Sequence, residues 1–382
     1  MQNTSIENPT EAGMQAWVAE FRGRALAQGI FAATFDAAMQ PVHFLPDVVE
    51  RDRKQDEFTR TIWDYLDRAV SDDRIASGQK ALKTHADLLT RIETAYGVDK
   101  HIVLAIWGLE SAYGAVRGDV YTPSALATLA YEGRRAAFFE TELLAALRIL
   151  QAGNVAPQHM VGSWAGAMGH TQFMPSSFLS LAVDFDGNDQ PDVWGDDPTD
   201  ALASTAAYLS KYAWKAGMRW GDEVTLPQGF DYGISGDRTQ KPMTVWAAMG
   251  ILDATGNPLA LDGWASLLLP AGSRGPAFLI RDNFAAIEAY NKADAYVIAV
   301  GHLADRIAGR PTFSATWPRD LRALTLPERK ELQQHLLDAG VYAGEADGKV
   351  GPLTIAAVKA FQRQQGLTPD GYPSLDVLVK LR

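Results

Sequence analysis

The chain has 382 residues, of which 47% are hydrophobic and 21% charged, so it is long enough for a large core and at least one further domain. Its formal net charge of −11 argues against nucleic acid or an anionic membrane surface as a partner, because both require a basic face. It contains no cysteine, which excludes disulfides, thiolate metal sites, thiol nucleophiles and a lipid on an N-terminal cysteine.

The first ten residues, MQNTSIENPT, have neither a basic start nor an apolar stretch, so the sequence predicts no signal peptide. A signal peptide removed earlier is compatible with this start. The most apolar stretches, such as LLAALRIL from Leu143, are soon interrupted by charge and fall short of the roughly 18 residues that span a bilayer. We therefore expect no membrane span.

Helices are predicted for most of the first 220 residues. In TRTIWDYLDRAV from Thr59 and ADLLTRIETAYG from Ala86, apolar residues recur at intervals of three and four. Gly97 is the expected end of the second helix.

The residue pattern changes between about residues 220 and 280, where glycine, proline and aspartate separate short apolar segments such as EVTLP, TVWAAMG and AFLI. This pattern predicts a small strand-bearing lobe. Helix is expected to return from Asn283 to Gly309.

A proline-containing stretch, GRPTFSATWPRD, then marks a domain boundary, which gives predicted domains at residues 1–318 and 319–382. Thr325 is followed three residues later by Glu328, with Pro327 between them, as in a capping box that opens a helix. A compact helical module is expected to begin there.

The segment from Asp99 to Gly114 reads as a buried helix, because residues 102–109 are apolar on nearly every side. Glu110 interrupts this apolar run. If the helix continues to about Gly114, Trp107 lies one turn before the carboxylate and Tyr113 one turn after it. Desolvation and the negative end of the helix dipole would then raise the pKa of Glu110, which suits a general acid.

The alternative is a structural role for Glu110. It would then lie where the helix reaches solvent, or would pair with an arginine such as Arg117, Arg134 or Arg135. The helix alone does not exclude this interpretation.

The segment GSWAGAMGHTQFMPSSF, from Gly162 to Phe178, combines glycines, small residues and one amide with a proline and two serines that suit a helix start. Such a backbone allows close approach of a ligand, although a tight packing turn explains the composition as well. Ser163 is not in a Gly-x-Ser-x-Gly setting, so a serine-hydrolase elbow is absent.

These two segments, AIWGLESAYG and GSWAGAMGHTQFMPSSF, resemble the membrane-bound lytic transglycosylase B family, also called soluble lytic transglycosylase B, among the lysozyme-like glycoside hydrolases. The segments YTPSALATLAYEGRRAAFF, PAFLIRDNFAAIEAYNKADAY and AVGHLADRI fit the same family, so the resemblance covers most of residues 15 to 310. It implies a mainly α (α+β) fold, a lysozyme-like body with the small strand-bearing lobe and a cleft for an extended glycan.

The resemblance also implies the site residues. The family's catalytic glutamate corresponds to Glu110, and its glycan-contacting loop to Ser163 and Gln172. The other substrate-binding positions are its paired arginines, Arg134 and Arg135, and its cleft asparagine and tyrosine, Asn291 and Tyr296, with Tyr290 adjacent. The two arginines could instead be solvated helix charges, and the two tyrosines could be core aromatics.

The last sixty or so residues resemble the common peptidoglycan-binding domain of three helices. Its marks in this chain are Asp347, Gly348, Gly351, Pro352, Thr354, Phe361, Gln362, Gly366, Leu367, Asp370 and Gly371. Most of these are structural. The glycines and Pro352 would shape turns, and Phe361 and Leu367 would fill a small core.

The segment DFDGNDQPDVWGDDPTD has oxygen-bearing side chains at Asp184, Asp186, Asn188 and Gln190, the alternate spacing of the first half of an EF-hand loop. Some members of the family bind a cation at this place. The sixth position is not glycine and the twelfth is not glutamate, so Asp196 or Asp200 would have to supply a late ligand. A solvated turn rich in aspartate and asparagine is the alternative to a calcium site.

Enzymes of this family are understood to use one glutamate as acid and then base, and to close a 1,6-anhydro ring without water. We therefore expect the protein to be a lytic transglycosylase that acts on peptidoglycan in the periplasm. It should require no cofactor, and its partner should be the glycan strands of peptidoglycan. One alternative is a hydrolysing lysozyme, which would need a second carboxylate such as Asp119 or Glu132. The other is an inactive wall-binding scaffold, which the intact Glu110 and Gln172 disfavour.

Overall fold

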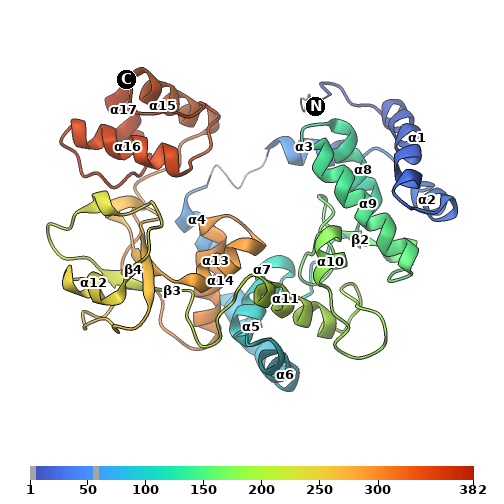
Figure 1. The fold of residues 1–382 in the computed structure, drawn as a ribbon, viewed down its shortest axis with the longest axis horizontal. Coiled ribbons are helices and arrows are strands. Elements are labelled where there is room, and N and C mark those ends of the chain that lie inside the picture. Colours follow the sequence, from blue (N-terminus) through green and yellow to red (C-terminus); the bar gives the residue numbers. More distant parts are fainter. Residues whose placement is uncertain (1–5, 55–59) are drawn as a thin grey trace. The chain divides into compact units, whose positions relative to one another are not determined.

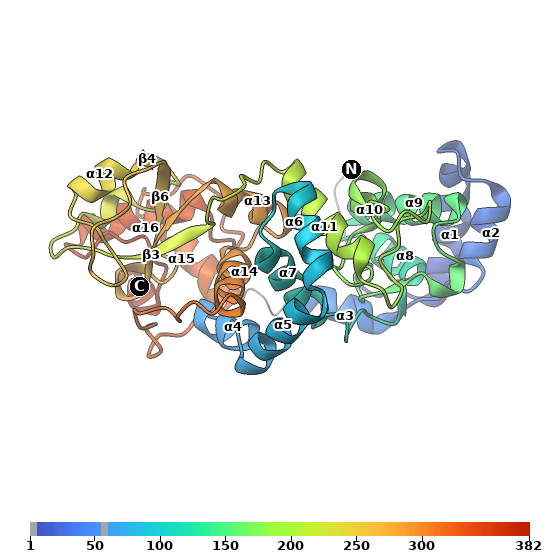
Figure 2. The same ribbon diagram turned by 90° about the horizontal axis from the view of Figure 1, so that it is seen from below.

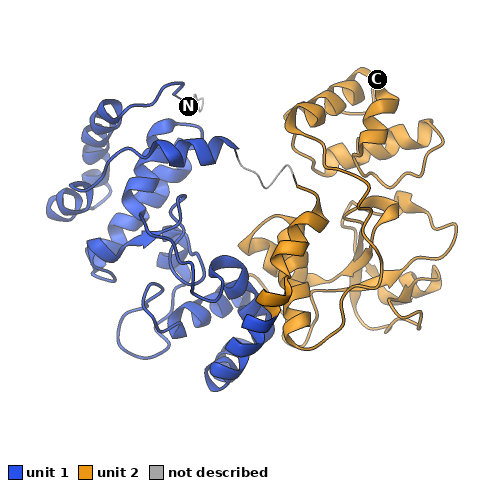
Figure 3. Cartoon of the chain, turned by 180° about the vertical axis from the view of Figure 1, so that it is seen from behind, with its two compact units in different colours: residues 1–55, 76–211 blue, residues 56–75, 212–382 orange. Residues whose placement is uncertain are grey.

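The computed structural model describes residues 6–54 and 60–382, and the chain divides into two compact units (Figure 3). Unit 1 consists of residues 1–55 and 76–211, and unit 2 of residues 56–75 and 212–382. The predicted mainly helical fold with a strand-bearing lobe is confirmed in the described part of the chain. None of the described helices is long and apolar enough to cross a membrane.

Unit 1 is built from helices and one two-stranded antiparallel sheet, β1 with β2 (Figure 1). Its elements, with most of α5 included, are α1 Glu11–Ala27, α2 Ala32–Met39, α3 Pro46–Lys54, α5 Asp72–Thr84, α6 Ala86–Tyr96, α7 Lys100–Ser111, β1 Val120–Tyr121, α8 Thr122–Glu132, α9 Ala136–Ala152, the 3₁₀ turn Pro157–His159, β2 Val161–Gly162, α10 Pro175–Leu181 and α11 Thr199–Lys211. Figures 1 and 2 both place α7 beside α11, and α6 packs on the same two helices. The predicted stop of α6 is confirmed, because Gly97 adopts the left-handed conformation at φ 69°.

Unit 2 contains the strand lobe, two long helices and the C-terminal helices. Its elements are α4 Ile62–Ala69, β3 Gly221–Thr225, the 3₁₀ turn Tyr232–Ile234, β4 Lys241–Pro242, α12 Met243–Ala248, β5 Leu252–Asp253, β6 Trp264–Leu268, the 3₁₀ turn Gly272–Arg274, β7 Ala277–Ile280, α13 Asp282–Tyr290, α14 Asp294–Ile307, α15 Leu326–Asp338, α16 Pro352–Gln364 and α17 Leu375–Leu381. The strands form an antiparallel sheet in the order β4-β6-β7-β3-β5. Its core is centred on the fully buried Trp246, whose indole N–H donates to the carbonyl oxygen of Ala265 (2.9 Å).

Three sequence predictions are refined by the structure. The piece TVWAAMG is not a strand but forms α12, which packs Trp246 under the sheet. The segment 283–309 is two helices, because the chain is extended at Asn291 (φ −150°) and α14 starts anew at Asp294. The helix predicted from Thr59 begins at Ile62, where the Thr61 hydroxyl accepts the N–H of Asp64 (3.2 Å), and Thr59 itself lies outside the described residues.

The C-terminal helices α15, α16 and α17 (red in Figure 1) enclose a core of their own. That core consists of Leu324, Leu332, Leu336, Ala357, Val358, Phe361, Val377 and Leu378. The predicted capping box is confirmed, with Thr325 and Glu328 each accepting the other's backbone N–H. Phe361 lies in the core as expected, whereas Leu367 is only half-buried, because it follows the end of α16.

Candidate active site

The helix α7, which carries Glu110, is capped at its start and buried along its length. The Asp99 carboxylate accepts the N–H of His101 (2.8 Å), and residues 102–108 are buried. Glu110 is half-buried in the last turn. The predicted helix therefore places the carboxyl group of Glu110 at the C-terminal end of a buried apolar helix.

The helix ends at Ser111, three residues before the predicted end, because Ala112, Tyr113 and Gly114 all have positive φ. Tyr113 still lies close to Trp107, with ring centroids 5.7 Å apart. It reaches this place by folding back over Gly108, where a Cβ would come within 2.6 Å of the tyrosine ring. Tyr113, the aromatic residue expected one helical turn after Glu110, is thus positioned by a chain that turns back after Ser111 and not by a further turn of helix.

A buried histidine ties the end of α7 to the loop that follows β2. The Trp107 indole N–H donates to His170 Nδ1 (3.1 Å), and the hydroxyl of Ser111 donates to the His170 carbonyl oxygen (2.5 Å). These two residues flank Glu110, one turn before it and one residue after it. Because Nδ1 accepts, the proton of the neutral ring is on Nε2, which donates to the Gly195 carbonyl oxygen (2.8 Å).

His170 is only 4% exposed. Burial, together with the nearby Arg117 guanidinium, lowers the pKa of His170 and outweighs the hydrogen bond to Gly195. The imidazole is therefore neutral near pH 7. A neutral, fully bonded ring fits a residue that fixes geometry and not one that transfers protons.

The same loop presents Ser163 and Gln172. Gln172 has the left-handed φ of 53°, and its Nε2 donates to the carbonyl oxygens of Arg117 (3.0 Å) and Gly169 (2.8 Å). Both amide protons are used, so the Oε1 of Gln172 is the atom left to accept a bond. Ser163 Oγ accepts the N–H of Ala167 (3.1 Å), which leaves the hydroxyl proton to be donated.

Close backbone approach explains the glycines of this loop. A Cβ on Gly169 would lie 1.9 Å from the carbonyl oxygen of Val193, and one on Gly162 would lie 2.2 Å from that of Ala167. The predicted start of the next helix at Pro175 is confirmed. There the buried Glu142 accepts both the backbone N–H (2.9 Å) and the hydroxyl (2.7 Å) of Ser176.

The two arginines of the predicted site are not solvated helix charges. They lie between α8 and α9, where Arg134 and Arg135 each bond one oxygen of Asp52, at 2.7 and 3.0 Å. Asp52 is 1% exposed. The neighbouring Glu132 is also buried and bonds the guanidinium of Arg53 (3.0 Å) and the backbone N–H of Arg134 (3.0 Å).

The remaining predicted contacts lie in unit 2. Tyr290 ends α13 and is half-buried, and Asn291 is exposed with its Oδ1 accepting the N–H of Ala293 (3.1 Å). Tyr296 is a core aromatic, 4% exposed within α14. Unit 1 thus holds Glu110, the two arginines and the loop of Ser163 and Gln172, and unit 2 holds the other three predicted contacts.

The aspartate-rich segment after α10 folds as a compact loop. Oxygens of Asp184, Asp186 and Asp200 lie within 4.8 Å of one another, so Asp200 and not Asp196 completes the cluster. Asp196 instead pairs with Arg117 (2.9 Å). Asn188 is exposed, and its Nδ2 donates to Asp186 (3.0 Å). The late oxygen that Gly195 cannot provide at the twelfth position thus comes from Asp200, in the first turn of α11.

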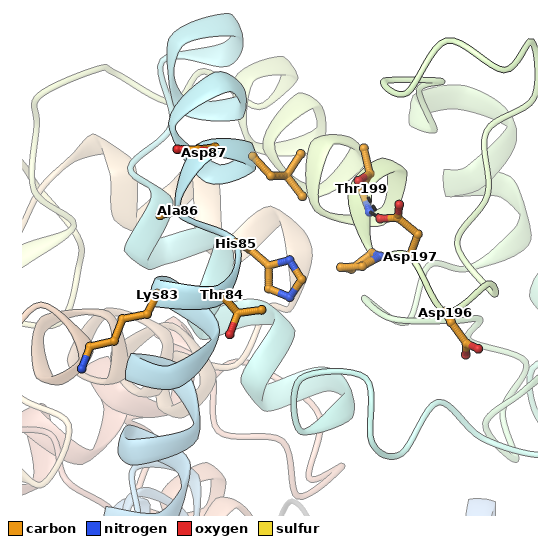
Figure 4. A pocket seen from close by; sticks show the side chains of 10 residues that line it. Lys83, Thr84, His85, Ala86, Asp87, Asp196, Asp197 and Thr199 are labelled. Atoms are coloured by element: carbon orange, nitrogen blue, oxygen red, sulfur yellow. Dashed lines mark hydrogen bonds between the residues drawn. The ribbon is translucent and has the colours of Figure 1, made fainter.

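A separate pocket of unit 1 opens where α5 meets α6, opposite the start of α11 (Figure 4). Its walls are formed by Lys83, Thr84, His85, Ala86, Asp87, Leu88, Asp196, Asp197, Pro198 and Thr199. The His85 ring points toward Asp197, whose carboxylate is held by the N–H (2.9 Å) and hydroxyl (2.6 Å) of Thr199. Of the candidate site residues named in the sequence predictions, only Asp196, the alternative late ligand of the aspartate-rich loop, lines this pocket.

Comparison with known proteins decides the family. Residues 13–305 match the transglycosylase SLT domain, and residues 325–381 match the putative peptidoglycan binding domain. The chain is a member of the SLT transglycosylase family. The resemblance read from the two segments around Glu110 and Gln172 is thereby confirmed.

Relatives of this transglycosylase include solved structures. The chain is 48% identical to SltB3 from Pseudomonas aeruginosa, whose structure is in complex with NAG-anhNAM-pentapeptide; the match covers 97% of this chain and 99% of that one, with a TM-score of 0.94. It is 28% identical to the Escherichia coli lytic transglycosylase Slt35 in complex with calcium, over 80% of this chain and 96% of that one, with a TM-score of 0.65. The curated membrane-bound lytic murein transglycosylase B of E. coli is 34% identical over 251 residues, 64% of this chain and 66% of that protein.

The bonding partners that hold the transglycosylase's site could not be read from the sequence. His170, Asp52 and Glu142 each bond a residue far away in the chain. The only sequence signal for His170 was its place between two loop glycines and Gln172. Asp52 and Glu142 occur in charged or amphipathic helices, where buried carboxylates have no distinct pattern.

Proposed function

We propose that this transglycosylase cleaves the MurNAc–GlcNAc β-1,4 bond of peptidoglycan and forms a 1,6-anhydro-MurNAc end, with Glu110 as the only catalytic carboxylate. The observation that carries the proposal is the position of Glu110, at the end of a buried helix and bonded through its neighbours to the loop of Ser163 and Gln172. The anhydro sugar in the SltB3 complex supports the same product.

The other buried carboxylates described in unit 1 have structural partners. Asp52 and Glu132 bond arginines. Glu142 bonds the start of α10, and Asp200 bonds backbone N–H groups of the aspartate-rich loop. The candidate second carboxylate Glu132 is therefore committed to Arg53, and Asp119 is exposed. This arrangement favours a reaction with one carboxylate over ordinary glycoside hydrolysis.

The chemistry needs a proton to leave Glu110 and to return. Protonated Glu110 gives its proton to the glycosidic oxygen, the C1–O bond breaks, and the acetamido oxygen of the sugar bonds to C1. The carboxylate of Glu110 then takes the proton of the sugar's 6-hydroxyl, whose oxygen attacks C1 and releases the acetamido group. Glu110 ends protonated, and no water is consumed.

The polarity of the loop matches an acetamido group. Gln172 offers an acceptor, because its N–H groups are held by two backbone carbonyls. Ser163 offers a hydroxyl proton. An acetamido group carries one N–H and one carbonyl oxygen, so it complements this pair. We assign Gln172 and Ser163 to substrate binding on this ground.

The arginine pair would bind acidic groups of the substrate. Asp52 accepts a hydrogen bond from each guanidinium and so orients it, while the side chains of Arg134 and Arg135 remain 38% and 41% exposed. Their remaining N–H groups can therefore reach carboxylates of the stem peptides. Tyr290 and Asn291, which end α13, are assigned to glycan contact from the family resemblance, whereas the burial of Tyr296 favours a supporting role.

Calcium is the cation that suits the aspartate-rich loop. Asp184, Asp186 and Asp200 provide only carboxylate oxygens, the ligands that calcium prefers, and the related Slt35 was solved in complex with calcium. Backbone N–H groups of residues 185–192 already orient these carboxylates. Calcium would stabilise the loop and would take no part in bond cleavage.

The module of α15, α16 and α17 would bind the wall, consistent with its match to the peptidoglycan-binding domain. A peptidoglycan substrate and a wall-binding module support a location in the periplasm, where the enzyme would act in wall remodelling. We keep the proposed domain boundary at residue 318, which falls between the two matched segments.

Cleavage in ¹⁸O-labelled water tests the reaction type. We expect the new chain ends to carry no label, because the 6-hydroxyl supplies the attacking oxygen. One labelled oxygen in each new MurNAc end would indicate hydrolysis and contradict the proposal. Absence of any cleavage by the folded enzyme would favour an inactive wall-binding scaffold.

A further inference from the structure

The C-terminal module, residues 324–382, contacts the strand lobe, residues 220–280, within unit 2. Lys359 on α16 is only 5% exposed, and its ammonium points at one turn of the lobe. It donates to the carbonyl oxygens of Gly233 (3.4 Å) and Ser235 and to the Ser235 hydroxyl (3.1 Å). Three acceptors from the lobe thus match the three N–H groups of a lysine in the module.

A carboxylate forms the second connection, and its two oxygens face different ways. Asp370 Oδ1 accepts from Gln362 Nε2 (2.7 Å) and from the N–H of Tyr372 (3.0 Å), both within the module. Its Oδ2 accepts from the N–H (2.8 Å) and the hydroxyl (2.9 Å) of Ser273 in the lobe. Asp370 is therefore bonded on both sides of the interface.

Two glycines of the lobe allow the backbones to approach closely. A Cβ on Gly272 would lie 2.5 Å from Asp370 Oδ2 and 2.7 Å from the Cβ of Tyr372. A Cβ on Gly236 would lie 3.0 Å from Ile355. The lobe surface at these positions fits the module only because side chains are missing there.

The segment that joins the module to α14 is also held. The backbone N–H groups of Ser314 and Ala315 donate to the two oxygens of Glu223 on β3 (2.8 and 2.7 Å). Further along, the ring of Trp317 packs on Trp63, with centroids 6.2 Å apart. A segment fixed at these points is not a flexible tether.

The hydrogen bonds of Lys359 and Asp370 make the interface largely polar, with apolar contacts at Ile355 and Tyr372, and each side has its own hydrophobic core. The core of the lobe and that of the module share no residue. Opening the interface would therefore expose polar groups to water and would leave both cores intact. Such a contact can be broken by mutation without unfolding either part.

We propose that Lys359 and Asp370 latch the C-terminal module onto the strand lobe, so that the module works as a rigid part of unit 2. The face of α16 that carries Lys359 is then closed to ligands, and wall is bound by another face of the module. Wall binding would orient unit 2 on the glycan, a consequence that rests on the proposed function.

The latch is tested in the full-length chain, which has no native cysteine to interfere with labelling. Spin labels on Asp262→Cys in the lobe and Asp376→Cys in the module, both exposed positions, report the distance between the two parts. We expect one narrow distance distribution for the parent chain. Lys359→Glu should broaden it, because a carboxylate would face three oxygen acceptors.

Two further variants make this result decisive. Asp370→Asn can keep its carbonyl oxygen toward Gln362 and Tyr372 while turning an NH₂ group against Ser273, so it disturbs the lobe side alone. Lys380→Glu makes the same charge change at an exposed position of α17 and should leave the distribution narrow. A broad distribution in the parent chain, or a narrow one in both latch variants, would overturn the proposal.

Activity measurements separate the latch from the proposed function. Cleavage of soluble glycan should be unchanged in Lys359→Glu, and sedimentation with intact wall should still occur. Cleavage of intact wall should fall by about tenfold, since a freely moving module loses the matched geometry of the two sites. Equal wall cleavage by the variant and the parent would refute the orienting role, whereas loss of all cleavage by the parent would contradict only the proposed function.

Discussion

Replacing His170 by phenylalanine tests how the end of α7 is held beside the glycan loop. The substitution keeps an aromatic ring but removes the acceptor of the Trp107 N–H and the donor to Gly195. Two lost hydrogen bonds cost about 1 kcal/mol each, and an unsatisfied indole N–H in the interior adds about 1–3 kcal/mol, so we expect a total of about 3–5 kcal/mol. The same change at the exposed His159 should cost less than about 0.5 kcal/mol.

Denaturant unfolding followed by circular dichroism measures these free energies. In a Trp107→Phe background the cost of His170→Phe should be smaller, because no indole N–H is then left without a partner. Turnover should fall while KM changes little, because Trp107 loses its bond to the imidazole and no longer fixes the end of α7 beside Glu110, whereas the bond from Ser111 to the backbone carbonyl of residue 170 remains. Equal costs in the two backgrounds, or full turnover in a folded His170→Phe variant, would refute the reasoning.

Three further predictions concern the metal, the module and pH. Calcium should raise the melting temperature relative to chelator by binding only the folded loop, Asp184→Ala should abolish the shift, and an unchanged parent melting temperature would remove the site. Truncation after Pro318 should leave a folded enzyme that cleaves soluble glycan but binds wall weakly, and failure to fold would contradict the two independent cores. Burial and the nearby Arg306 lower the pKa of His302 from 6.5 to about 4, so the unfolded chain binds more protons between these values and stability falls as pH drops. Between pH 7 and about 4, the free energy of unfolding of the parent chain should fall by about 3 kcal/mol more than that of His302→Phe, as measured by denaturant titration. Equal losses in the two proteins would show that His302 is not the group responsible.

Local sequence signals predicted the elements that depend on neighbouring residues. The stop at Gly97, the helix start at Pro175 and the capping box at Thr325 all follow from backbone requirements within one turn. The break at Asn291 was missed, because the apolar periodicity continues through it without glycine or proline.

The site was predictable only where its residues form a motif. Glu110 and Gln172 could be proposed from the sequence because each lies in a segment with a recognisable pattern, whereas Asp52 and His170 act through partners that the fold brings together. The choice of Asp200 over Asp196 was likewise open, since it depends on where α11 begins relative to the loop. Spacing limits which residues can meet, but burial and long-range contacts decide which do.

The central claim is that one carboxylate serves as acid and base. Mass spectrometry of the products released from purified peptidoglycan by the parent enzyme and by Glu110→Gln tests it most directly. We predict anhydro-ended sugars from the parent and a loss of rate of about 10⁴-fold or more in the variant, because an amide can neither supply the proton nor take it back. Anhydro products formed at the parental rate by Glu110→Gln would contradict the account.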